Sequence, residues 1–73
     1  MIVKEMVEKL RVNCFVEIRV NNHKVICVER DNINVVKEEL LNKEVDNWGV
    51  DNTGRLLSTM DKIFVDTVER EGV

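Results

Sequence analysis

Two cysteines and one histidine are the side chains of this 73-residue chain best suited to nucleophilic, proton-transfer or metal-binding chemistry. Cys14 and Cys27 lack the C-x-x-C spacing of a redox or metal motif, and each lies in an apolar run that favours a reduced, buried thiol. His23 has no second histidine or cysteine at ligand spacing and no nucleophile within its local motif, which favours an exposed turn residue. We therefore expect no catalytic residue and no metal site at these positions.

The acidic side chains do not form a catalytic pair. Glu38 and Glu39 are neighbours on an expected helix, where successive side chains point about 100° apart, so they cannot act as an acid–base dyad. The stretch DNWGVDNTG at 46–54 fails the calcium-loop pattern, because Trp48 stands where that pattern needs a carboxylate or amide. Phosphate-binding glycine loops and zinc-protease or serine-hydrolase motifs do not occur. The sequence predicts a protein that is not an enzyme, with no cofactor and no small-molecule substrate.

Length and composition predict one folded domain over 1–73. The chain is 44% hydrophobic and 34% charged, which is too apolar for a disordered chain. The opening MIVKEMVEKL interrupts its apolar residues with charges, and no run reaches the roughly 18 apolar residues of a membrane span. We expect a cytoplasmic protein without a membrane partner.

Charge is divided unevenly along the chain. Residues 1–30 contain six Lys/Arg and four Asp/Glu, a net charge of +2, whereas residues 31–73 contain five and ten, a net charge of −5. The bases of the first part alternate with acids instead of forming a patch, so we expect no direct binding to nucleic acid. The acids of the second part are concentrated between residues 38 and 51, against the single Lys43: Glu38, Glu39, Glu44, Asp46 and Asp51.

Hydrophobic periodicity predicts the elements that carry these residues. Apolar residues at helical spacing predict helices at about 2–10, 34–43 and 54–70, and alternation predicts a β-hairpin at about 13–29. A further strand at 44–50 is possible, with an irregularity at Gly49. The expected fold is α+β, a two- or three-stranded antiparallel sheet packed with the three helices.

The register of the hairpin has two solutions. A two-residue turn at 21–22 places Val20 opposite His23 and Ile18 opposite Val25. A three-residue loop instead places Ile18 opposite Ile26. The run VICV is apolar on both faces, so both registers remain open.

The last predicted helix has the clearest apolar stripe, and Val65 projects from its opposite, polar side. Trp48 stands beside Gly49 and between carboxylates, where it can either cover the edge of a small core or anchor an interface; we favour the core edge. The residues that we consider for protein contacts are Trp48, Val65, Glu38, Glu39, Glu44, Asp46 and Asp51.

The segments VKEMVEKL, VEIRVNNHKVICV and EELLNKEVDNWGVDN together resemble small uncharacterised proteins of phages and prophages of low-GC Gram-positive bacteria. The likeness covers about the first fifty residues, and the amphipathic segment 54–70 departs from that group, whose ends often have a strand pattern. The resemblance implies a phage or mobile-element accessory protein in the host-cell cytoplasm. It assigns no activity, and no functional residue is carried over.

Two functional classes remain. The first is a non-catalytic interaction module, a homodimer or small adaptor that binds a protein through a helix face or sheet edge, because so short a chain must cover its apolar stripe. The alternative is an acidic inhibitor that occupies a basic, nucleic-acid-binding surface of a host or defence protein, which the acids between residues 38 and 51 suggest.

Overall fold

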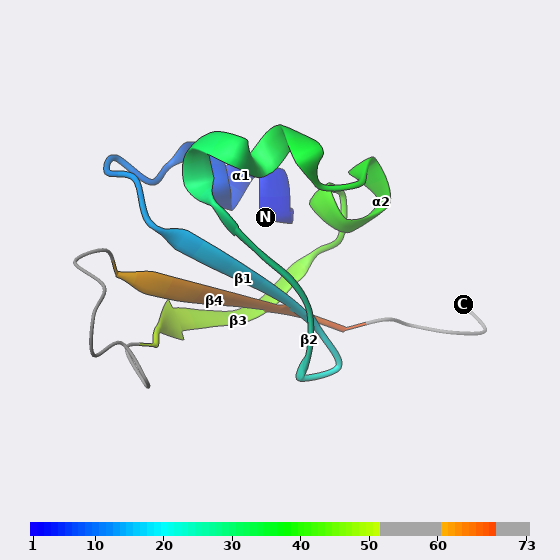
Figure 1. Cartoon of the computed structure of the whole chain (residues 1–73). Coiled ribbons are helices and arrows are strands. Elements are labelled where there is room, and N and C mark those ends of the chain that lie inside the picture. The colour runs from blue at the N-terminus through cyan, green and yellow to red at the C-terminus, as the bar shows by residue number, and fades with distance from the viewer. Residues whose placement is uncertain (52–60, 69–73) are drawn as a thin grey trace.

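The computed structural model of the chain describes residues 1–51 and 61–68, in which short helices lie on one side of a twisted sheet (Figure 1). The sheet has the strand order β2-β1-β4-β3. β1 and β4 are parallel at its centre, and each pairs antiparallel with an outer strand. The elements are α1 Val3–Glu8, β1 Phe15–Val20, β2 His23–Glu29, the 3-10 helix η1 Arg30–Val35, α2 Glu38–Leu41, β3 Val45–Val50 and β4 Lys62–Thr67.

The core lies between the helices and one face of the two central strands. Alternate residues of a strand point to opposite faces, and Ile18 of β1 is paired with Val65 of β4, so both side chains lie on the helix side. Both are fully buried, together with Val3 of α1. The other buried hydrophobic residues are Met6, Val7, Cys14, Val16, Val36 and Leu41. We call this side of the sheet the covered face and the other side the open face.

The hairpin combines the two registers that the sequence left open. The asparagines at 21–22 have φ angles of 51° and 66°, the positive values that a two-residue type I′ turn requires, and Val20 pairs with His23. Beyond a bulge in the ladder, however, Ile18 pairs with Ile26, as in the alternative register. The extra residue in β2 returns the apolar side chains of both strands to the covered face.

The expected fold class is wrong. In the part of the chain that the structure describes, the sheet is four-stranded and mixed, and its helices are short. The hairpin 13–29 and the strand 44–50 correspond to β1, β2 and β3, and the helix 2–10 corresponds to α1. The parallel pairing of β1 with β4 changes a small antiparallel sheet into a mixed one.

The predicted helix 54–70 is replaced by a strand where the structure describes it. β4 occupies Lys62–Thr67, whereas residues 54–60 and 69–70 of the prediction lie outside the described residues. The sequence KIFVDT alternates as well, because Ile63, Val65 and Thr67 fall on one side of a strand, and these three residues are β-branched. The apolar residues of this short segment fit both the helical period and the alternation of a strand. It forms a strand because β1 and β3 can pair with it.

The predicted helix 34–43 is divided in two. η1 ends at Val35, and Val36 and Lys37 are extended, with ψ angles of 138° and 140°, before α2 begins. The break turns Val36 into the core, where 4% of it is exposed. None of the helices in the described residues is long and apolar enough to cross a membrane.

Candidate protein-interaction surface

The outer edge of β3 is partly covered by the first residues of the chain. The Val45 N–H donates to the Met1 carbonyl oxygen at 2.9 Å, and the Val3 N–H donates to the Lys43 carbonyl oxygen at 3.0 Å. Ile2 forms an isolated bridge with Glu44. The start of β3 is therefore paired on its outer side, and the open part of the edge begins after it.

The main-chain groups of Trp48 and Val50 point away from the sheet. At the end of β3, the Asp51 N–H donates to the Lys62 carbonyl oxygen at 2.7 Å, so this peptide group faces β4. Residues of an antiparallel strand face the neighbouring strand alternately, which directs the N–H and C=O groups of residues 48 and 50 outward. No residue of the described ranges 1–51 and 61–68 pairs with them on that side. This open stretch is an edge available to another strand.

The side chains of Trp48 and Val50 add an apolar patch to this edge. They are opposite Val65 and Ile63 in the β3–β4 ladder, so both lie on the covered face. The helices pack over the centre of the sheet, and 57% of Trp48 and 57% of Val50 remain exposed. Our expectation that Trp48 covers the edge of the core is therefore wrong. We call Trp48, Val50 and the edge between them the β3 patch.

On the open face, Gly49 lies between these two residues and packs against an aromatic ring. A Cβ atom on Gly49 would stand 3.0 Å from Cε1 of Phe64, so the ring fills the space that a side chain would occupy. On the ring of Phe64, the guanidinium carbon of Arg19 lies 4.5 Å from the centroid, a cation–π distance. Glycine thus allows β3 to lie close to Phe64.

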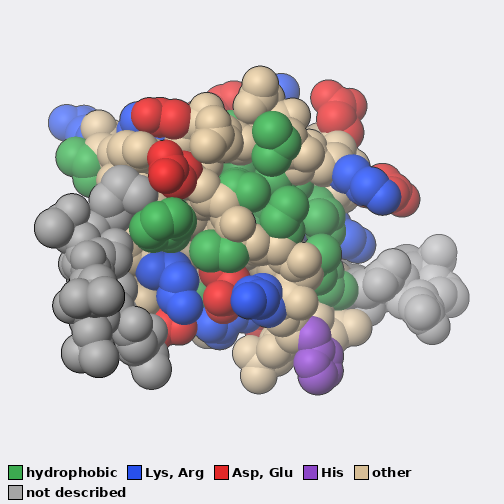
Figure 2. Space-filling model, viewed as in Figure 1, with side chains coloured by type: hydrophobic (Ala, Val, Ile, Leu, Met, Phe, Trp, Pro, Cys, Tyr) green, Lys and Arg blue, Asp and Glu red, His purple; other side chains and the backbone are tan. Residues whose placement is uncertain are grey.

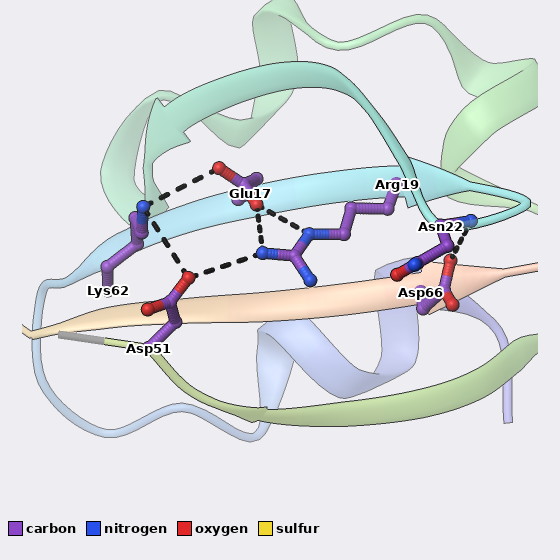
Figure 3. Close-up of polar contacts among 6 residues, drawn as sticks. All are labelled: Glu17, Arg19, Asn22, Asp51, Lys62 and Asp66. Atoms are coloured by element: carbon purple, nitrogen blue, oxygen red, sulfur yellow. Dashed lines mark hydrogen bonds and ion pairs between the residues drawn. The ribbon is translucent and has the colours of Figure 1, made fainter. Parts of the chain in front are cut away.

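A four-residue ion-pair network on the open face holds the end of β3 (Figure 3). Glu17 accepts a hydrogen bond from Nε of Arg19 and lies 3.6 Å from Nζ of Lys62. Asp51 lies 3.2 Å from Nη2 of Arg19 and 3.8 Å from Nζ of Lys62. Two carboxylates and two cations cancel in charge, and each side chain is less than one third exposed. The network connects β1, β4 and the end of β3, and it fixes the position of the β3 patch.

This network was not predicted from the sequence, although two of its four residues are close together along the chain. Glu17 and Arg19 are two residues apart in a strand and therefore share a face, which favours an ion pair. Lys62 reaches them only through the pairing of β4 with β1, and the sequence predicted a helix there. On the surface seen in Figure 2, acidic and basic side chains lie next to one another in the lower middle of the view, below exposed hydrophobic side chains.

The structure separates the candidate residues named from the sequence. Val65 is fully buried and is not a contact residue; it was expected on the polar side of a helix, but in β4 it points into the core. Glu38, Glu39 and Asp46 are exposed, and the exposed Glu44 pairs with the Met1 amino group at 3.1 Å.

Asp51 lies apart from these acids, on the open face with Arg19 and Lys62. The acidic cluster expected between residues 38 and 51 is therefore incomplete.

The two cysteines have different environments, which corrects the expectation that both are buried. Cys14 is buried, and burial raises the pKa of its thiol, against a smaller lowering by the Arg30 charge. Cys27 is exposed on the open face, opposite Glu17. His23 is exposed beside the turn, as expected. Among residues 1–51 and 61–68, no group of three His, Cys, Asp or Glu side chains is arranged to hold a metal ion.

A pocket of ≈ 240 Å³ lies between α1 and the η1–α2 segment. Its apolar lining includes Val7, Val36 and Leu41, which belong to the core, and Lys4 and Glu8 also line it. Ligand pockets typically enclose roughly 300–1,000 Å³. This pocket is smaller, so the β3 patch remains the strongest candidate surface.

Comparison of the chain with protein-family models, with curated proteins and with solved structures found no match.

Proposed function

We propose that this chain is a non-catalytic protein-interaction module that binds through the β3 patch, in the cytoplasm. One observation carries the proposal: exposed Trp48 and Val50 lie beside an open strand edge. Strand edges bind extended partners through main-chain hydrogen bonds, and tryptophan is enriched at the centres of protein interfaces. The phage-like sequence pattern fits an accessory protein of this kind.

The ion-pair network supports a binding role over a catalytic one. Its carboxylates and cations are paired with one another, and the network positions a strand instead of presenting a reactive group. Gly49 and Phe64 hold the same strand from the open face. A prearranged edge loses little conformational entropy when a partner binds.

An affinity experiment with three immobilised proteins tests the proposal. The wild type, Trp48→Ser and the control Val35→Ser are exposed to bacterial lysate and to the free chain itself. Val35 is a suitable control because it is 66% exposed and lies in η1, outside the β3 patch. We expect a bound protein, which can be the chain itself, that the wild type and Val35→Ser retain and Trp48→Ser loses.

Two results would contradict the proposal. If the three proteins retain the same set, or if none retains anything, the β3 patch is not a binding surface. Retention of a nucleic-acid enzyme that is independent of Trp48 and lost at high salt would favour the acidic-inhibitor alternative, because exposed ion pairs weaken as salt rises.

A further inference from the structure

We propose that the partner of the β3 patch is a second copy of this chain, which pairs antiparallel with β3 across a two-fold axis at Gly49. The inference rests on the proposed function and specifies its partner. In the dimer, the two sheets join edge to edge through β3, so that β3 of one protomer continues the sheet of the other.

The main-chain geometry of β3 is self-complementary about Gly49. The outward-facing groups belong to Trp48 and Val50, which are two residues apart with Gly49 between them. An axis at Gly49 places Trp48 of one copy opposite Val50 of the other. Each such pair exchanges both of its N–H···O=C bonds, as hydrogen-bonded antiparallel pairs do. The open groups of one edge are thus satisfied by the same groups of the other.

The side chains of the β3 patch match under the same axis. Trp48 and Val50 share the covered face, so each exposed tryptophan meets an exposed valine of the second copy. Aromatic and β-branched residues are favourable cross-strand partners. At the axis itself, Gly49 meets Gly49 in a non-hydrogen-bonded pair, where strands approach to about 4.5 Å between Cα atoms. Gly49 has no side chain, so on the face where Phe64 packs, this close pair does not have to accommodate two facing side chains.

Charge favours β3 over the opposite edge of the sheet. The stretch Asn47–Val50 contains no charged side chain, and under the proposed axis Asp51 falls opposite the neutral Asn47 of the second copy. Asp51 is also held by Arg19 and Lys62.

β2, the other outer strand, has the features that prevent edge pairing. Its ladder contains a bulge, and it carries the charged residues Lys24 and Glu29. Bulges and charges on an edge discourage the addition of a strand. A second copy therefore pairs through β3, and β2 remains the edge of the joined sheet.

The contact is short, so we expect a reversible dimer with a dissociation constant on the order of micromolar. Sedimentation equilibrium of the full chain over concentrations on both sides of that value measures it. Val50→Pro removes the outward N–H of Val50 and leaves the β3–β4 ladder intact, because edge strands tolerate proline where the N–H faces solvent. We expect its dissociation constant to rise at least about tenfold, the effect of losing two hydrogen bonds of ordinary strength.

A second variant and a control distinguish the loss of the dimer from the misfolding of a variant. Trp48→Asp keeps the backbone and introduces a carboxylate beside the axis, and we expect it to raise the dissociation constant as well. Val35→Asp adds the same charge at an exposed site in η1 and is expected to dimerise like the wild type. Circular dichroism confirms the fold of each variant.

Cross-linking tests the register itself. In a Cys27→Ser background, a mixture of Trp48→Cys and Val50→Cys chains under a mild oxidant is expected to form a disulfide faster than either chain alone. A monomeric wild type, or a dimer that both β3 variants leave unchanged, overturns the inference. If the wild type is monomeric yet retains a different protein in a Trp48-dependent way, the proposed function stands and the second copy is excluded.

Discussion

The two faces of the sheet use the same central strands in opposite ways. On the covered face, Ile18 and Val65 are fully buried beneath the helices. One residue away along β1, Glu17 on the open face is 6% exposed, and ion pairs with Arg19 and Lys62 surround it. The parallel β1–β4 pair is held by apolar packing on one side and by charge on the other. No helix of residues 1–51 and 61–68 covers the open face, and ion pairs there take the place of apolar packing.

Ile18→Ala should have the largest effect on stability. Ile18 is fully buried on the covered face, and truncating such a residue costs about 2–5 kcal/mol through lost burial and the cavity left behind. Urea unfolding monitored by circular dichroism measures the loss. Val12→Ala, at a position that is 70% exposed, is the matched control and should change the free energy of unfolding by less than about 0.5 kcal/mol. Equal effects at the two positions would contradict the assignment of the core.

Glu17→Gln should destabilise the protein less, by about 1–3 kcal/mol. The substitution keeps the shape of the side chain but leaves Arg19 and Lys62 with Asp51 as the remaining carboxylate of the network. Both cations are partly buried, so water replaces the lost partner incompletely.

Glu39→Gln is the control for the Glu17 substitution, because Glu39 is exposed on α2. It should leave the free energy of unfolding nearly unchanged. If both variants have the stability of the wild type in urea, the open face is not held by charge.

Gly49→Ala should destabilise by about 1 kcal/mol. The added Cβ would meet Cε1 and Cζ of Phe64 at 3.0 and 3.1 Å, so the ring has to move away from its contact with Arg19. Within a strand, alanine is ordinarily more stable than glycine by roughly 0.5–1 kcal/mol. We expect the cost of the contact with Phe64 to exceed that gain. In a Phe64→Leu background the contact is relieved, and the same substitution should become neutral or stabilising. A Gly49→Ala effect that is the same in both backgrounds would show that Phe64 is not the cause.

The sequence predicted the local elements better than the pairing between them. α1 and the hairpin follow from the period of their own residues, whereas β3 does not, because Val45 and Val50 have opposite parity and the strand was expected only as one alternative. β4 could not be recognised, because Ile63 and Phe64 fit a helical stripe with their neighbours, and the strand is selected by its pairing with β1, which is distant in sequence. The bulge in β2 is likewise set by the requirement that Ile26 lie beside Ile18.

The candidate surface was predicted in part. Trp48 was named from its residue type and from the glycine beside it, but its exposure depends on where the helices lie over the sheet. Val65 was assigned to the wrong side because a helix and a strand direct it to opposite faces. The partners of Glu17 required the register of β4, which is not encoded in any local pattern.

We expect Cys14 and Cys27 to differ clearly in their reactivity toward thiol reagents. Of the expected effects, this one involves the smallest change in stability. Cys27 on the open face should react rapidly with a thiol reagent such as Ellman's reagent, whereas buried Cys14 should react only as the protein unfolds. In a Cys27→Ser variant the fast reaction should disappear, and in denaturant the slow thiol should become reactive. Rapid reaction of Cys14 in the folded protein would show that the covered face is open near β1.

The raised pKa of Cys14 also predicts that the stability of the protein depends on pH. Burial favours the neutral thiol, so the folded protein holds this proton more tightly than the unfolded chain does. The contribution to stability is complete below the ordinary thiol value of 9.0 and is lost as the pH rises from there through the raised pKa of the folded state. Urea unfolding of the Cys27→Ser variant at neutral and alkaline pH should show this decline. A Cys14→Ala variant in the same background should show a smaller decline, because its side chain has no proton to lose, and identical declines would assign the effect to other groups.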